Sequence, residues 1–201
     1  MMTVALATED ALSEAIGLRL LSELPRTTSV NHLLRKDGSG YLRSRMDSWR
    51  KMAQRQVVLI LTDLDQIACP LALREDWFGN TPLHANLMLR IAVREVESWV
   101  LADHDAMREL IGIKGKLPAK PDELPDPKRH LLDLAKYAPR AIRQDLVKEY
   151  STFTLQGIGY NARLTHLVKT VWSPERAALR SPSLQRTRRR LNELLLRPDE
   201  V

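Results

Sequence analysis

The 201-residue sequence contains a single cysteine, Cys69, and no long hydrophobic run. One cysteine excludes an intramolecular disulfide and any zinc site built from cysteines, and it is typical of a protein in a reducing cytoplasm. The longest apolar run, residues 57–61, has the length of a strand and falls well short of the roughly 20 residues that span a bilayer. The N-terminus has no basic segment or cleavage site, so we expect no signal peptide. These absences predict a cytoplasmic protein without membrane-spanning segments.

Glycine-rich phosphate loops are also absent. The pair Gly157 and Gly159 lacks the further glycine of a dinucleotide-binding fingerprint, and no lysine stands in a P-loop context. The pair therefore predicts a turn, and the chain has no nucleotide-hydrolysis motif of its own. The five histidines are scattered without metal-ligand spacing, and the four tryptophans stand singly rather than as a stacking platform for single-stranded nucleic acid.

Positive charge is concentrated in the last third of the chain. Residues 1–138 hold 19 basic and 19 acidic residues, whereas residues 139–201 hold 12 and 6. A localised positive field favours an anionic partner, most often nucleic acid, because neutralised phosphates release counterions. The densest basic group consists of Arg186, Arg188, Arg189 and Arg190. This group predicts either a phosphate-binding surface or an ordinary solvated helix face.

Apolar runs alternate with helical periodicity in the first half of the sequence. Strands are predicted at residues 3–7, 28–34, 57–61 and 87–93. Helices are predicted at residues 12–20, 41–52 and 94–102, with a short one before the fourth strand. The run at 57–61 is apolar throughout, as expected of a parallel strand that is covered on both faces. The alternation predicts an α/β fold with a mostly parallel sheet of about four strands flanked by helices.

Beyond a proline-rich connector at residues 112–127, the pattern is helical. Helices are predicted at residues 131–137, 142–150, 162–172 and 183–197. We therefore expect an α/β core over residues 1–111 and a helical C-terminal extension over residues 112–201 that packs on the core as one structural unit.

Acidic residues follow three of the predicted strands. Glu9 follows the first strand, Asp63 and Asp65 follow the third, and Glu95 and Glu97 follow the fourth. In an open parallel sheet, binding sites lie outside the carboxyl ends of the strands. Magnesium binds a few carboxylate oxygens and keeps water or phosphate oxygens in its other positions. The pattern predicts a site for one or two divalent ions, and two such ions can stabilise the attacking and leaving oxygens of a phosphodiester.

Each acid also has a structural alternative. Glu9 could complement the positive end of the next helix, the aspartates could cap a helix or shape a turn, and Glu97 could pair with Arg94. On a helix that begins at Arg94, Glu95 and Glu97 point about 200° apart, so at most one of them would face a metal. The gathering of acids at strand ends favours a site over these separate roles.

The ordered acids resemble the TOPRIM fold, a metal-binding domain of topoisomerases, primases, recombination nucleases and OLD-type nucleases. Those proteins carry a glutamate after the first strand and an Asp-x-Asp after a later one, as Glu9 and Asp63-Leu64-Asp65 do here. Three further motifs are Val-Arg-Glu-Val-Glu-Ser-Trp-Val-Leu-Ala-Asp at 93–103, Asp-Pro-Lys at 126–128 and Ser-Pro-Ser-Leu at 181–184. With these motifs almost the whole chain is similar to the TOPRIM-like family called domain of unknown function 4276, except that phenylalanine is usual at position 184.

The resemblance implies a Rossmann-like TOPRIM core and assigns roles to individual residues. Glu9 would be a metal ligand or general acid/base, and Asp63, Asp65 and Glu97 would be further ligands of Mg²⁺ or Mn²⁺. Lys128 would stabilise charge in the transition state of phosphoryl transfer, or it is a solvated lysine in the first turn of a helix. Members of the family are often encoded beside an AAA-type ATPase in bacteria, in arrangements reminiscent of antiphage defence.

Residues and resemblance together predict a metal-dependent nuclease, a hydrolase that cleaves phosphodiester bonds of DNA or RNA, as the effector subunit of an ATPase-linked bacterial defence system. The alternative is a non-catalytic TOPRIM-like module whose arginine cluster and basic helices dock an ATPase or nucleic acid. Topoisomerase activity is not expected, because no tyrosine has a recognisable nucleophile context. No membrane partner is expected, and a homo-oligomer is compatible with either hypothesis.

Overall fold

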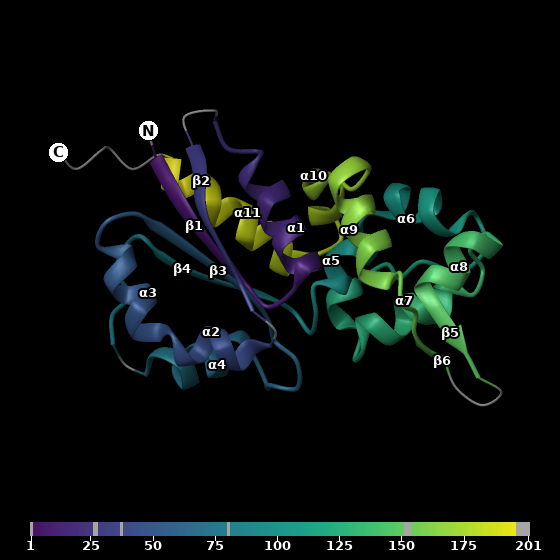
Figure 1. Cartoon of the computed structure of the whole chain (residues 1–201), viewed down its shortest axis with the longest axis horizontal. Coiled ribbons are helices and arrows are strands. Elements are labelled where there is room, and N and C mark those ends of the chain that lie inside the picture. The colour runs from purple at the N-terminus through teal and green to yellow at the C-terminus, as the bar shows by residue number, and fades with distance from the viewer. Residues whose placement is uncertain (1, 26–27, 37, 80, 151–153, 196–201) are drawn as a thin grey trace.

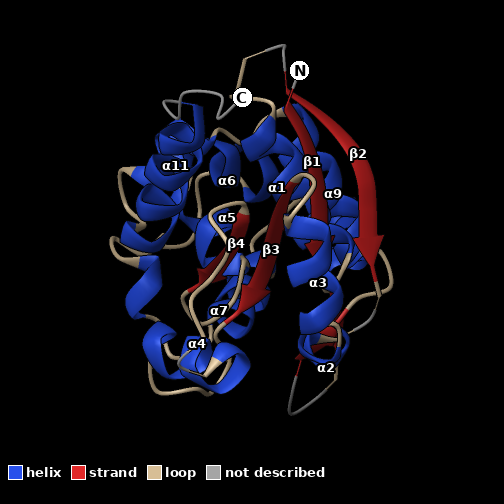
Figure 2. Ribbon diagram, turned by 90° about the vertical axis from the view of Figure 1, so that its left-hand side faces the viewer, coloured by secondary structure: helices blue, strands red, loops and turns tan. Residues whose placement is uncertain are grey.

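The molecule is built around a parallel sheet of four strands (Figures 1 and 2). This computed structural model describes residues 2–25, 28–36, 38–79, 81–150 and 154–195. The sheet contains β1 (Met2–Thr8), β2 (Thr28–Arg35), β3 (Val57–Asp63) and β4 (Leu87–Ala92). The connecting helices are α1 (Ala11–Leu21), α2 (Ser39–Ser44), α3 (Met46–Ala53) and α4 (Pro70–Phe78). The predicted α/β fold, with a sheet of about four parallel strands flanked by helices, is confirmed.

The strand order is β2-β1-β3-β4, so β2 is added on one side of β1, and β3 and β4 are added on the other side. The strand order therefore reverses between β1 and β3. Thr8 of β1 is in register with Leu61 of β3, and Asp63 of β3 is in register with Ala92 of β4. These three strands therefore end at nearly the same level. Ligands of open parallel sheets bind outside the carboxyl ends of the strands where the order reverses. The topology thus brings the residues that follow β1, β3 and β4 to the edge of the sheet where sites are built.

Side chains of the central strand enter two separate hydrophobic clusters, one on each face of the sheet. On β3, Leu59 and Leu61 belong to the cluster that contains α1, whereas Val58 and Ile60 belong to the cluster that contains α3 and α4. Burying one such aliphatic side chain contributes about 1.5–3 kcal/mol. Every residue from position 57 to position 62 is buried, which explains why this run has no polar alternation.

The second half of the chain consists mainly of short helices. They are α5 (Glu97–Ala102), α6 (His104–Ile111), α7 (Pro127–Ala135), α8 (Arg140–Leu146), α9 (Tyr160–Thr170), α10 (Pro174–Ala178) and α11 (Pro182–Leu195), with a 3₁₀ turn at Pro121–Glu123. Helix α9 packs along α1, and α11 returns to lie against β4, in the yellow end of the chain in Figure 1.

Two fully buried tryptophans connect the halves of the molecule. The indole of Trp172 donates to the carbonyl of Trp99 at 3.0 Å, and the indole of Trp99 donates to the hydroxyl of Ser183 at 2.7 Å. Both rings belong to the same hydrophobic cluster as α1 and β1. One cluster therefore joins residues on either side of position 111, where the sequence predicts that the core ends and the extension begins.

The helix predicted over residues 142–150 is wrong in its second half. Helix α8 ends at Leu146, and the chain continues into β5 (Val147–Glu149), which pairs antiparallel with β6 (Thr154–Gln156). The amide of Gly157 donates to the carbonyl of Leu146 at 2.9 Å. A Cβ atom at Gly157 would lie 2.2 Å from the carbonyl oxygen of Asp145, so only glycine permits this close return of the chain.

Other helix boundaries also differ from the sequence prediction. The helix predicted over residues 41–52 is divided at Arg45 into α2 and α3, and the helix predicted from residue 94 begins only at Glu97. Helices α6 and α10 were not predicted, and residues 196–197 of the last predicted helix lie outside the described residues. Within the described ranges, no helix combines the length and the apolar character that crossing a bilayer requires.

Candidate active site

Glu9 lies immediately after β1 and turns its carboxylate toward the end of β3. Its Oε1 accepts a hydrogen bond from the amide of Asp63 at 3.1 Å and another from the hydroxyl of Thr62. Burial raises the pKa of Glu9, against the effect of these two donors. The N-terminus of α1 is capped by Asp10 instead, whose carboxylate accepts from the amide of Ser13 at 2.8 Å. Glu9 is therefore free of the capping role and spans the ends of the two central strands.

Asp63 is the last residue of β3 and lies at the centre of a group of acids. Its Oδ1 accepts a hydrogen bond from the amide of Val96 at 2.9 Å, which ties the end of β3 to the segment that follows β4. Burial raises the pKa of Asp63 well above its usual value, and the neighbouring charges of Glu97, Glu9 and Asp65 raise it further. The predicted acids therefore act on one another directly.

Asp65 is exposed and lies in a loop with unusual backbone geometry. Asp65 has a φ of 49° and Arg94, in the facing loop, has a φ of 54°. The amide of Asp65 donates to the carbonyl of Arg94 at 2.9 Å, and the guanidinium of Arg94 donates to the carbonyls of Asp65 and Ile67. A left-handed non-glycine residue costs roughly 1 kcal/mol or more, and such strain is concentrated at functional sites. These contacts hold the loops after β3 and β4 against each other at the acidic edge.

Glu97 is the first residue of α5 and the most buried of the acids, with 5% of its surface exposed. The hydroxyl of Tyr160 donates to its Oε1 at 2.9 Å. Burial, followed by the charge of Glu95, raises the pKa of Glu97 to about 7, while Lys128 and the tyrosine hydroxyl act in the opposite direction. A carboxyl group with this pKa can gain or lose a proton near neutral pH.

Lys128 comes to the acidic edge from the first turn of α7. Its backbone amide donates to Oε2 of Glu95 at 2.8 Å, and its Nζ lies 5.5 Å from the centre of the Tyr160 ring. Asp126 caps the same helix end by accepting from the amide of Arg129 at 2.6 Å. Lys128 therefore lies beside the acids, where its positive charge acts on Glu95 and Glu97.

Glu95 belongs to the acidic group together with Glu97, whereas the sequence predicts that at most one of the two faces a metal. That reasoning placed Glu95 and Glu97 about 200° apart on one helix. The left-handed turn at Arg94 delays the start of α5 to Glu97, so Glu95 lies in a loop and the angular argument does not apply. The charge of Glu95 acts on Glu97, and the charge of Asp65 acts on Glu95.

The structure thus places the predicted residues Glu9, Asp63, Asp65, Glu97 and Lys128 at one edge of the sheet, joined by the contacts described above. Two residues at this edge, Thr62 and Tyr160, were not predicted as part of the site, and Glu95 was considered only as an alternative to Glu97. Glu95 had a sequence signal, because it follows β4 directly. Tyr160 had none, because it reaches the edge only through the packing of α9 against the core.

Any metal at this edge would be held by carboxylate oxygens. In the described part of the chain, no group of three or more His, Cys, Asp or Glu side chains is placed to hold a metal ion. Magnesium needs fewer protein ligands, because it binds through one or two carboxylates and keeps several waters. The acids here supply oxygen ligands of this kind. Their negative charges repel one another, and a divalent cation would reduce that repulsion.

Several other residues of the family-like motifs have structural partners. Asp103 is completely buried and forms an ion pair with Arg176 at 2.8 Å. The amide of Ser183 donates to Asp122 at 2.8 Å, and the Ser183 hydroxyl accepts from Trp99. These residues join α5, α6, α10 and α11. Their role is therefore to hold the helices next to the acidic edge in place, and they take no part in its chemistry.

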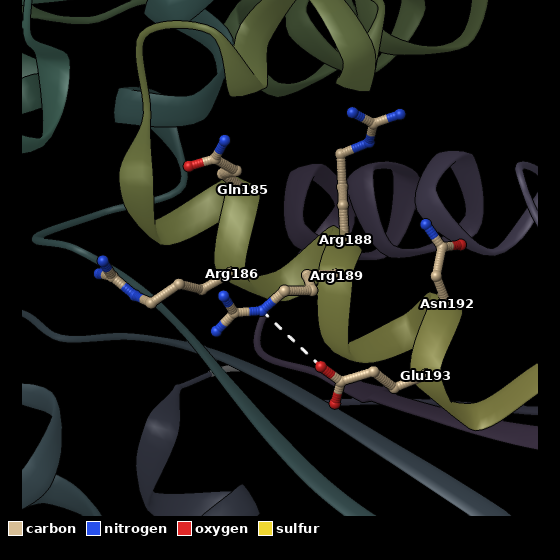
Figure 3. Close-up of a pocket in the computed structure, with 6 residues that line it drawn as sticks. All are labelled: Gln185, Arg186, Arg188, Arg189, Asn192 and Glu193. Atoms are coloured by element: carbon tan, nitrogen blue, oxygen red, sulfur yellow. Dashed lines mark ion pairs between the residues drawn. The ribbon is translucent and has the colours of Figure 1, made fainter. Parts of the chain in front are cut away.

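The predicted arginine cluster lies on α11, where Figure 3 shows Arg186, Arg188 and Arg189, and its members differ in their partners. Arg188 forms two hydrogen bonds with Glu23, at 2.8 and 3.0 Å. Arg190 and Arg189 pair with Glu193 at 2.8 and 3.7 Å. Arg186 points away from Arg188 in Figure 3. Among the described residues, the ion pairs of the cluster involve Arg188, Arg189 and Arg190 but not Arg186. The cluster is therefore three paired arginines and one unpaired arginine, not a uniform basic surface.

Comparisons of the chain with models of protein families, with curated proteins and with solved structures found no match. The resemblance to TOPRIM-like proteins therefore stays a prediction from the sequence motifs. The chemistry of the acidic edge has to follow from the residues that form it.

Proposed function

We propose that this protein is a metal-dependent nuclease that cleaves phosphodiester bonds of nucleic acid at the acidic edge of its sheet. The observation that carries the proposal is the gathering of acids where parallel strands β1, β3 and β4 end, with Glu9 held by the amide of Asp63 and Asp63 held by the amide of Val96. Burial and the neighbouring carboxylates raise the pKa of Asp63, in agreement with this arrangement. A group of acids held so close is unfavourable without a cation. We propose Mg²⁺ or Mn²⁺ as that cation, with ligands drawn from Glu9, Asp63, Asp65 and Glu97.

The protein groups around the acids support a hydrolytic role. The backbone amides of Asp63 and Val96 fix the carboxylates of Glu9 and Asp63, so both acids are oriented before anything binds. Tyr160 holds Oε1 of Glu97 in place, and Lys128 supplies a positive charge beside it for a phosphate oxygen. When bound, the metal would neutralise phosphate charge and activate water as the nucleophile.

The partners proposed for this nuclease follow from what the chain lacks. It has no nucleotide-hydrolysis motif, so we propose that a separate ATPase subunit controls the rate of cleavage above a basal activity of the chain alone, as in the defence arrangements that the resemblance implies. The sole cysteine, Cys69, is an exposed free thiol, which supports a cytoplasmic location.

A second candidate is a non-catalytic binding module. It is favoured by the fact that most of the acids have a protein partner, since Glu9 and Asp63 accept from backbone amides, Glu95 accepts from Lys128 and Glu97 accepts from Tyr160. On this view the acids join strands and loops, and they hold no catalytic ion.

A cleavage assay separates the two candidates. The purified protein is incubated with mixed DNA and RNA in Mg²⁺, in Mn²⁺ and in EDTA, beside Asp63→Asn and the control Asp47→Asn. Asn at position 63 can still accept from Val96, so the fold is retained, whereas Asp47 is a solvent-exposed acid on α3. We expect metal-dependent cleavage that Asp63→Asn lowers at least about a hundredfold and that Asp47→Asn leaves unchanged. Cleavage by Asp63→Asn at the wild-type rate, or none by wild type in either metal, would contradict the nuclease and favour the binding module.

A further inference from the structure

A groove of about 310 Å³ lies beside the edge strand of the sheet, between α4, β4 and α11. Its apolar wall includes Leu71 and Leu83, and Leu71 is 58% exposed. Its charged residues are three arginines, Arg74 from α4, Arg90 from β4 and Arg186 from α11. Three separate elements therefore bring cations to one groove.

The three arginines of the groove have no carboxylate partner within ion-pair distance among the described residues. This distinguishes them from Arg188 on the same helix, which is held by Glu23. Glu193, the acid whose charge acts on Arg90, is already paired with Arg190 at 2.8 Å. The groove thus carries positive charge that the folded chain does not neutralise.

The environment of Arg90 is electrostatically unfavourable for its positive charge. Burial lowers the pKa of Arg90 to about 10, and the charges of Arg190 and Arg186 lower it further in the same direction. A half-buried guanidinium beside like charges is unfavourable unless an anion joins it. Guanidinium groups bind phosphate oxygens in pairs of parallel hydrogen bonds, which makes phosphate a well-matched anion.

We propose that this groove binds the phosphate backbone of a nucleic acid strand through Arg74, Arg90 and Arg186. Apolar side chains such as Leu71 would lie against sugars or bases, as expected of a polynucleotide and not of inorganic phosphate alone. The proposal rests on the proposed nuclease function for its choice of nucleic acid over an acidic peptide.

The position of the groove suits delivery of a strand to the acidic edge. Arg90 lies two residues before the end of β4, or about 7 Å along a strand, and Glu95 follows three residues after that end. A bound strand that continues in the direction of β4 therefore reaches the acids. The groove would act as a positioning surface and the acidic edge as the place of cleavage.

The test measures binding without cleavage. Short fluorescein-labelled single-stranded DNA and RNA of mixed sequence are titrated with the full-length protein in EDTA, and fluorescence anisotropy is followed over a range of salt concentrations. The variant is Arg74→Gln/Arg186→Gln, because both residues are exposed and their replacement leaves the core intact. The control is Arg189→Gln, an exposed arginine of α11 that pairs with Glu193 and lies outside the groove.

We expect the double variant to bind about tenfold or more weakly and to reduce the slope of log K against log salt by about 1.4, since each phosphate contact on a single strand contributes about 0.7. Arg189→Gln should stay within about twofold of wild type. Equal affinity and slope for the double variant would overturn the proposal, as would binding of poly-glutamate without binding of either nucleic acid.

The same measurement keeps this proposal separate from the nuclease itself. Binding is followed in EDTA and cleavage in Mg²⁺ or Mn²⁺, so each proposal has its own readout. If wild type binds through the groove but never cleaves, the nuclease proposal is wrong and the groove proposal is supported. If wild type cleaves and the double variant binds as wild type does, the groove proposal is wrong and the nuclease proposal is supported.

Discussion

The acidic edge of the sheet and the arginine face of α11 each gather four or more like charges, but they hold them in different ways. At the edge, Glu97 is almost completely buried and Asp63 is surrounded by other acids. On α11, Arg189 is largely exposed and pairs with an acid one turn away. In the first region burial and mutual repulsion raise the pKa values of the acids, and in the second region the charges are neutralised by ion pairs on the surface.

This difference shows which charged residues indicate a functional site. Exposed ion pairs contribute at most about 1 kcal/mol and are common on helix surfaces. Buried like charges are unfavourable, so a fold that retains them has a reason other than stability. By that criterion the acidic edge points to function, whereas Arg188 and Arg189 are ordinary surface residues.

The largest expected effect concerns Glu97 and the dependence of stability on pH. Its pKa of about 7 lies above the ordinary value of 4.5, so the folded protein binds more protons than the unfolded chain between these values. Its contribution to stability is therefore present at low pH and is lost as the pH rises toward 7, by an amount on the order of 3 kcal/mol. Glu97→Gln should be more stable than wild type at pH 8 by about that amount, and the difference should vanish near pH 4, as measured by urea unfolding.

Glu75→Gln is the matched control for this change, because Glu75 is exposed on α4. It should leave the pH profile of unfolding unchanged. A Glu97→Gln variant that is no more stable than wild type at pH 8 would show that the carboxyl group at position 97 is not held against burial, and the contrast between the two regions would fail.

A smaller effect is expected from Tyr160→Phe, which removes the hydroxyl that donates to Glu97. A hydrogen bond to a charged acceptor contributes about 1.5–3 kcal/mol and one to a neutral acceptor about 1 kcal/mol. The loss of unfolding free energy should therefore be greater at pH 8 than at pH 5. Tyr137→Phe, at an exposed position, is the control and should have no effect at either pH. An equal loss at both pH values would argue that the hydroxyl does not stabilise an ionised Glu97.

The smallest effects belong to the arginine face. Arg188→Gln breaks a two-bond contact with Glu23 and should lower the free energy of unfolding by about 1 kcal/mol, whereas Arg189→Gln breaks a single long contact and should change it by less than about 0.5 kcal/mol. Both losses should shrink in high salt. A loss above about 2 kcal/mol for either variant would mean that this face is structural rather than solvated.

The strands and the main acids could be predicted because their signals are local. The apolar run at residues 57–61 requires burial on both faces, and a strand of that kind ends where Asp63 begins the polar segment. Glu9 and Asp63 meet because β1 and β3 pair in parallel register, which follows from the alternation of strands and helices. The sequence is sufficient for these residues because each lies within one or two positions of a strand end.

The remaining parts of the site depend on the tertiary structure. Glu95 faces the acids only because Arg94 takes a left-handed conformation, which its residue type does not favour. Tyr160 reaches Glu97 across a separation of 63 residues, through helix packing that no short pattern encodes. The hairpin of β5 and β6 depends on the close approach of Gly157 to Asp145, and the sequence alone shows only a glycine pair.

The central claim is that the acidic edge binds a divalent cation, and thermal unfolding in Mn²⁺ tests it most directly. Binding to the folded state alone raises the melting temperature in proportion to the logarithm of the metal concentration above Kd. We predict that Mn²⁺ raises the melting temperature of wild type and of Asp47→Asn but not that of Asp63→Asn. No rise for wild type, or the same rise for Asp63→Asn, would contradict a metal site at the ends of β1, β3 and β4.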